Sequence, residues 1–181
     1  MSESTVPSLR YWPDWVGLAA RLTFGIVLIV AAVPKLANIP WFIRSIYAYQ
    51  LLPVEVANVM GYALPVVELV VGILLVLGLL TRPAAAVGFV LMGMFMVGII
   101  WAWSQGLSID CGCFGTGGVI PPEETRYPQE LARDLGLAAL TAWLVVRPRS
   151  LFSLDQVLFP EISLADEAVD DEVAEAATAH V

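Results

Sequence analysis

Two cysteines, Cys111 and Cys113, are the residues of this chain best suited to redox chemistry. They are its only cysteines, and they lie in the sequence Ile-Asp-Cys-Gly-Cys-Phe-Gly. Gly112 between them leaves the backbone free to bend, so the two thiols can close a small, strained disulfide ring. Strain makes such a disulfide easier to reduce. A structural disulfide adds most stability when it closes a long loop, and the loop between these cysteines is very short. The spacing therefore favours an exchanging redox pair over a structural disulfide.

Two other interpretations of this pair stay open. Buried or interfacial cysteines can be inert small hydrophobic residues. A metal site is the second alternative, but two thiolates are too few for a closed zinc site. The only histidine, His180, lies near the end of the chain. We expect no bound metal, and we predict that Cys111 and Cys113 are the catalytic residues of a thiol–disulfide oxidoreductase component.

Basic residues near the cysteines would support this chemistry, because nearby cations raise the thiolate fraction of a cysteine. Lys35 at the end of the first apolar segment, together with Arg44, Arg126 and Arg133, is expected to share a face with the pair. Asp110, next to Cys111, works against this effect.

Charged residues inside apolar segments form a second unusual group. Glu68 lies near the middle of an apolar segment. A carboxylate there costs ~2.5–3.5 kcal/mol on insertion scales, so it needs a partner or a water pocket. Arg21 is the expected partner, since a helical rise of ~1.5 Å per residue brings Glu68 near the reach of its long side chain. Such a pair would either pin two helices together or form a proton or quinone-headgroup site, and both alternatives stay open.

The composition of the chain is that of a membrane protein. Hydrophobic residues make up 59% of its 181 residues and charged residues only 14%, whereas a soluble domain is nearer half apolar and a quarter charged. An ordinary cytosolic enzyme does not fit. The net charge of −8 lies mostly in residues 161–181, which hold seven of the 17 acidic residues, so ten acidic residues face nine basic ones elsewhere. This balance offers no basic surface for nucleic acid.

Four apolar segments are long enough to cross a membrane as helices, which takes about 20 residues each. They are residues 15–37, 54–80, 84–104 and 129–146. The last is the weakest, because Glu130, Arg133 and Asp134 crowd its first turns, where we expect them to form an interfacial cap. A polar turn at residues 81–83 separates the second and third segments. We predict an all-α integral membrane protein, a four-helix transmembrane bundle with short interfacial helices.

The segments suggest an orientation and three parts of the chain. Arg147 and Arg149 flank the last span, so the positive-inside rule places both termini inside and the cysteine loop outside. The N-terminal flank lacks the basic residues of a signal peptide, so the first span is expected to stay in the membrane. The predicted parts are an N-terminal segment 1–14, a membrane domain 15–147, and an interfacial helix with an acidic, disordered tail 148–181. A short amphipathic helix is also expected within residues 38–53.

The ordered set of these features resembles the DoxX-like superfamily, specifically its methylamine-utilisation MauE branch. The resemblance covers about residues 15–146, and its most specific part is the C-G-C-F-G loop. Pro34 departs from the expected pattern, because a less restrictive residue is expected before Lys35. The matching residues are Arg21, Gly25, Lys35-Leu36, Tyr49-Gln50-Leu51-Leu52-Pro53, Pro65, Glu68, Gly72 and Cys111-Gly112-Cys113-Phe114-Gly115.

The resemblance implies a four-helix protein of a prokaryotic cytoplasmic membrane that is linked to thiol–disulfide chemistry. MauE is associated with maturing a disulfide-rich periplasmic dehydrogenase beside a thioredoxin-like partner, and DoxX relatives are linked to quinone-dependent sulfur oxidation. A quinone is therefore the cofactor class that the resemblance implies, while the residues themselves identify no cofactor. No dehydrogenase-specific feature occurs in the chain, so methylamine metabolism is not carried over.

These observations predict a membrane thiol–disulfide redox protein whose extracytoplasmic cysteine pair exchanges electrons with a thioredoxin-fold partner. Two other functions stay open: a non-catalytic membrane anchor for a redox partner, and a small transporter with Glu68 as its proton site. The predicted supporting residues around Cys111 and Cys113 are Lys35, Arg21, Glu68, Gly112 and Arg133.

Overall fold

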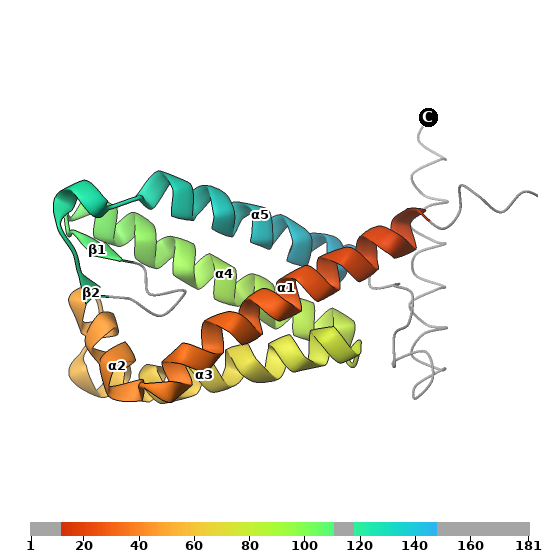
Figure 1. Cartoon of the computed structure of the whole chain (residues 1–181), viewed down its shortest axis with the longest axis horizontal. Helices are drawn as coiled ribbons and strands as arrows, with labels where there is room; N and C mark the ends of the chain where they lie inside the picture. Colours follow the sequence, from red (N-terminus) through yellow and green to blue (C-terminus); the bar gives the residue numbers. More distant parts are fainter. Residues whose placement is uncertain (1–11, 111–117, 148–181) are drawn as a thin grey trace, which may run out of the picture.

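Helices make up nearly all of the regular structure in the computed structural model, which describes residues 12–110 and 118–147 (Figure 1). This agrees with the all-α class predicted from the sequence. The elements in chain order are α1 (Trp12–Ala37), α2 (Ile39–Ala48), α3 (Val54–Leu77), α4 (Thr81–Ser104), β1 (Ile109–Asp110), β2 (Gly118–Val119), the short 3-10 helix η1 (Pro122–Glu124) and α5 (Tyr127–Val146).

Three of the helices are long and apolar enough to cross a membrane: α1 from Trp15 to Ala37, α3 and α4. They make the chain a multi-pass membrane protein. Helix α5 has 20 residues, about 30 Å at 1.5 Å per residue, which matches a bilayer core. Its first turns are too polar to meet the same standard, so the fourth span stays a prediction.

The long helices pack side by side in a bundle (Figure 1). Helices α3 and α4 run in opposite directions, α5 packs along α4, and α1 lies across α3 with its most extensive contacts there. Helix α2, the two short strands and the start of α5 lie together at one end, which we call the hairpin end. Helix α2 is the short helix that was predicted within residues 38–53. Pro34 does not interrupt α1, which continues to Ala37.

The turn between α3 and α4 lies a few residues before the predicted position. Gly78 ends α3 in the left-handed conformation, with φ 70°, and its N–H donates to carbonyl groups of the last turn. Glycine adopts this conformation without the steric cost of a Cβ atom. The predicted turn at residues 81–83 is instead the first turn of α4, where Pro83 is tolerated because its missing N–H needs no helical partner.

Two glycines bring α1 and α3 into close contact. A Cβ atom built on Gly72 would lie 2.9 Å from the carbonyl oxygen of Gly25, and one built on Gly25 would lie 3.0 Å from the carbonyl oxygen of Gly72. Small residues at such crossings let helix backbones approach closely in membranes. This contact fixes the register of the two helices, and with it the position of every charged side chain along them.

The substitution Gly72→Ala is expected to lower the free energy of unfolding by about 1–3 kcal/mol, the usual cost of overpacking. The new methyl group would meet backbone atoms, which cannot move aside as a flexible side chain can. Gly93→Ala is the matched control, because nothing lies within 4 Å of a Cβ atom there. Detergent-unfolding curves of the two variants should diverge, and equal stabilities would contradict the close crossing.

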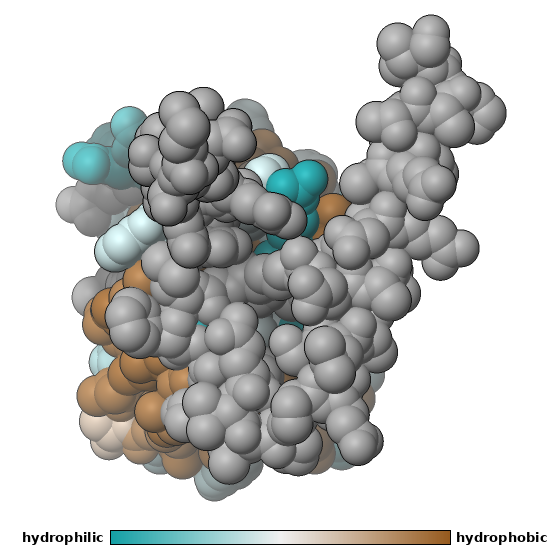
Figure 2. All heavy atoms as spheres, turned by 90° about the vertical axis from the view of Figure 1, so that its right-hand side faces the viewer, coloured by the Kyte–Doolittle hydropathy of each residue, from teal (hydrophilic) through white to brown (hydrophobic). Residues whose placement is uncertain are grey.

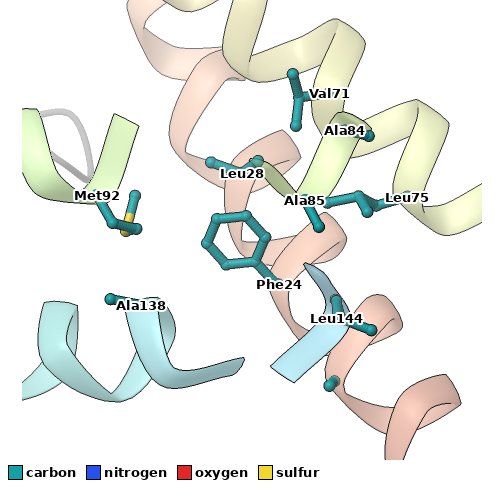
Figure 3. Packing of buried hydrophobic residues seen from close by; sticks show 10 residues of the cluster. Phe24, Leu28, Val71, Leu75, Ala84, Ala85, Met92, Ala138 and Leu144 are labelled. Carbon is teal, nitrogen blue, oxygen red and sulfur yellow. The ribbon is translucent and has the colours of Figure 1, made fainter. Parts of the chain in front are cut away.

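Apolar residues from four helices fill the middle of the bundle (Figure 3). Phe24 and Leu28 of α1 face Leu75 of α3, Ala85 of α4 and Leu144 of α5. Figure 2 views the bundle from the end at which α1 begins. The described residues that are visible along its sides are largely hydrophobic. An apolar exterior around an apolar core suits a bilayer better than water.

Candidate functional site

A buried ion pair joins α1 to α3. The ammonium nitrogen of Lys35 lies 2.7 Å from Oε1 and 2.9 Å from Oε2 of Glu68. Lys35 is only 3% exposed and Glu68 0%. The rings of Phe42 on α2 and Phe95 on α4 also face the ammonium group, with centroids 5.1 and 5.3 Å from it. Both charges are therefore compensated, as apolar surroundings require.

The sequence predicted Arg21 as the partner of Glu68, and this prediction is wrong. In the structure the partner is Lys35. The glycine crossing gives the reason. Arg21 precedes Gly25 on α1, while Glu68 precedes Gly72 on the antiparallel α3, so these two charges lie on opposite sides of the crossing. Lys35 follows Gly25 and lies on the same side as Glu68. Arg21 is itself buried in the bundle, 2% exposed, away from this pair.

A second pair of charges, from α5, lines the same cavity as Lys35 and Glu68. Arg133 donates from Nε and from one terminal nitrogen to Oδ1 of Asp134, at 3.1 and 3.0 Å. Asp134 is 2% exposed. The cavity volume of ≈ 20 Å³ is enough for about one water molecule. We call these four residues the polar cluster.

Asp134 is the member of the polar cluster that the sequence prediction missed. The sequence suggested an interfacial cap for Glu130, Arg133 and Asp134, but Asp134 is buried against the other helices. A helical pattern could have shown this. Tyr127, Asp134 and Thr141 are seven residues apart, which places them on one face of α5, and all three are buried.

The cysteine pair follows directly after a short antiparallel ladder at the hairpin end. Ile109 pairs with Val119 and Asp110 with Gly118, and Ile120 N–H donates to the Ser108 carbonyl at 2.9 Å. These contacts hold together the two ends of the segment that contains the cysteines. Three predicted site residues, Cys111, Gly112 and Cys113, lie outside the described residues.

Tyr127 anchors this ladder to α5. Its hydroxyl group donates to the Leu107 carbonyl and accepts the Ile109 N–H at 3.1 Å. Its ring stacks on Trp103 of α4, with ring centroids 6.2 Å apart. Ile99, Ala102, Ile109 and Tyr127 form a buried apolar cluster under the ladder. The segment before the cysteines is therefore fixed to both α4 and α5.

The substitution Tyr127→Phe is expected to loosen this end without unfolding the bundle. Ile109 is 2% exposed, so the loss of the hydroxyl leaves its N–H buried without that acceptor, at a cost of about 1–3 kcal/mol. Hydrogen exchange of residues 107–110 should therefore accelerate in the variant. Tyr62→Phe is the control, because Tyr62 is exposed on α3. Unchanged exchange at residues 107–110 would show that the hydroxyl does not hold the ladder.

The hairpin end also gathers the basic residues expected near the cysteines. Lys35 lies in the last turn of α1, and Arg44 is exposed on α2. Arg126 is exposed just before α5, and Arg133 lies in the second turn of α5. Helix α2 contacts β2 and also places Phe42 over Lys35. Among the residues of the described part of the chain, no group of three or more His, Cys, Asp or Glu side chains could hold a metal ion.

Residues 13–147 match the protein-family model described as methylamine utilisation protein MauE. The chain belongs to the MauE family. The match spans α1 to α5 and includes Cys111 and Cys113. It ends at residue 147, one residue after the end of α5. The wider DoxX-like placement stays a prediction. Searches of curated proteins and of solved structures found no match.

Proposed function

We propose that this MauE-family membrane protein is a thiol–disulfide redox protein, in which Cys111 and Cys113 exchange a disulfide with a thioredoxin-fold partner. The observation that supports it best is the anchored ladder. Ile109 and Asp110, immediately before the pair, are fixed to β2 and to Tyr127. Because the ladder is held at one end of the helix bundle, we expect the adjoining cysteine pair to occupy a defined position when a partner protein binds.

The exchange is balanced in atoms and electrons. The thiolate of one cysteine attacks the partner's disulfide, forms a mixed disulfide and releases one partner thiolate. The second cysteine then attacks the mixed disulfide, so the pair ends as a disulfide and the partner as a dithiol, two electrons richer. The reverse sequence oxidises the partner. We propose the extracytoplasmic side for this exchange, because disulfides persist in oxidising compartments.

Repeated turnover needs a further carrier for the two electrons when the pair oxidises a partner dithiol. We propose a membrane quinone, which takes up two electrons and two protons to become a quinol while the cysteine dithiol becomes a disulfide. The ≈ 20 Å³ cavity of the polar cluster has room for about one water molecule, so a quinone ring would have to bind elsewhere on the bundle.

Trapping of the mixed disulfide tests the exchange. The variants Cys111→Ser and Cys113→Ser, each reduced and purified in lipid nanodiscs, are mixed with a thioredoxin probe that keeps one active-site cysteine, activated as a mixed disulfide with thionitrobenzoate. Attack then releases thionitrobenzoate, and the probe has no second thiol that could break the adduct. The variant that keeps the attacking cysteine should form a covalent adduct that dithiothreitol dissolves. If neither variant forms an adduct while a partner still binds without covalent bonds, the chain is a membrane anchor and not an exchanging protein.

A further inference from the structure

Asp134 is buried, but its ion pair lies within α5 and does not link α5 to another helix. Its partner Arg133 is the preceding residue of the same helix. Only Oδ1 of Asp134 accepts those hydrogen bonds. Oδ2 is buried and has no hydrogen-bond partner among residues 12–110 and 118–147. Since a buried acceptor without a partner is costly, this oxygen requires a donor that the neighbouring side chains do not supply.

Lys35 has bonding capacity left on the other side of the cavity. An ammonium group carries three N–H donors. The two oxygens of Glu68 accept hydrogen bonds from it at 2.7 and 2.9 Å, which leaves one N–H for another acceptor. Lys35 and Asp134 both line the cavity, whose remaining lining is mostly apolar. A molecule bound there must therefore donate to a carboxylate and accept from an ammonium group.

We infer that the polar cluster binds one water molecule, which accepts from the Lys35 ammonium group and donates to Oδ2 of Asp134. The size of the cavity, ≈ 20 Å³, exceeds the ~10–15 Å³ that a water molecule needs. Buried water usually makes two to four hydrogen bonds to polar groups that are otherwise unsatisfied. The bound water joins α5 to the Lys35–Glu68 pair, so one hydrogen-bonded chain connects α3, α1 and α5.

Infrared spectroscopy of the full-length protein in nanodiscs tests this inference independently of the cysteine chemistry. Spectra in ordinary water and in water labelled with heavy oxygen should show an O–H stretching band of an internal water that shifts with the label. The absence of such a band in the unsubstituted protein would overturn the inference. A protonated-carboxyl band that disappears in Asp134→Asn would also overturn it, because Oδ2 would then carry its own proton.

Three variants assign the band to this site. Asp134→Leu should abolish it, because the acceptor is removed. Ala31→Leu should also abolish it without changing any charge, because Ala31 lines the cavity and the larger side chain fills it. Leu135→Ala is the control and should keep the band, because Leu135 is exposed on α5 and does not line the cavity. A band that persists in both Asp134→Leu and Ala31→Leu would place the water elsewhere and contradict the proposal.

Discussion

Replacement of Glu68 with leucine alone is expected to destabilise the bundle by about 3–5 kcal/mol, the usual cost of breaking a buried ion pair by removing one partner. Lys35→Met alone should have a similar effect. Each single variant leaves one charge of the pair in apolar surroundings without its counter-charge, since both residues are at most 3% exposed. These are among the largest effects that single substitutions produce.

The double variant Lys35→Met/Glu68→Leu should recover most of that loss, because apolar residues of similar volume often replace a buried ion pair at little cost. Unfolding in mixed detergent micelles, followed by circular dichroism, gives the three free energies. The control cycle pairs Arg21→Met with Glu68→Leu. Their effects should add, because Arg21 and Glu68 lie on opposite sides of the Gly25–Gly72 crossing. Additive effects for Lys35 and Glu68 would contradict the ion pair.

The second large effect is expected at the cysteines. Cys111→Ser and Cys113→Ser should each reduce thiol–disulfide exchange with a thioredoxin-fold probe to the rate without the protein. A complete exchange needs both an attacking and a resolving thiol, so removing either one stops the cycle. The measurement is the rate at which reduced probe appears, followed by alkylation of its free thiols.

Folding and exchange must be separated in that experiment. Serine is close to cysteine in size, and the described core clusters lie outside the segment 111–117. Both variants should therefore unfold at the same detergent concentration as the unsubstituted protein. Tyr127→Phe provides a comparison in which the ladder before the pair is altered but both thiols are kept. Exchange that continues in both serine variants would rule out a catalytic role for the pair.

The membrane helices could be predicted from the sequence because each is a continuous apolar segment of membrane length. The predicted segments coincide with α1, α3 and α4 to within a few residues. The turn between α3 and α4 was misplaced because Thr81-Arg82-Pro83 is polar and contains a proline, yet proline is also suited to the first turn of a helix. The left-handed Gly78 that ends α3 is the stronger signal.

The partner of Glu68 could not be predicted from distances along single helices. That prediction measured the depths of Arg21 and Glu68 from the same membrane surface, whereas the register depends on where α1 and α3 touch. The contact of Gly25 with Gly72 sets that register. A glycine in each span was visible in the sequence, but nothing in the sequence shows that these two glycines face each other.

Asp134 was missed for a different reason. A charged residue near the start of a weakly apolar helix is usually solvated, and its neighbour Arg133 supported that interpretation. In the structure α5 packs along α4 and also contacts α1, so its first turns line the cavity beside Lys35. Burial here follows from how the helices pack, which composition alone does not reveal. Cys111 and Cys113 themselves lie outside the described residues, and their role stays a proposal.

The most direct test of the redox proposal is an equilibrium titration of the cysteine pair. The full-length protein in nanodiscs is equilibrated in thiol–disulfide buffers of increasing potential and then alkylated with a mass-tagged maleimide. If the two cysteines form a redox pair, the number of free thiols should fall from two to none in a single two-electron transition. The midpoint potential of this transition should lie above about −300 mV, because strained disulfides are reduced more easily than structural ones. Two thiols that stay free at every potential, or that never become free, would contradict the proposal.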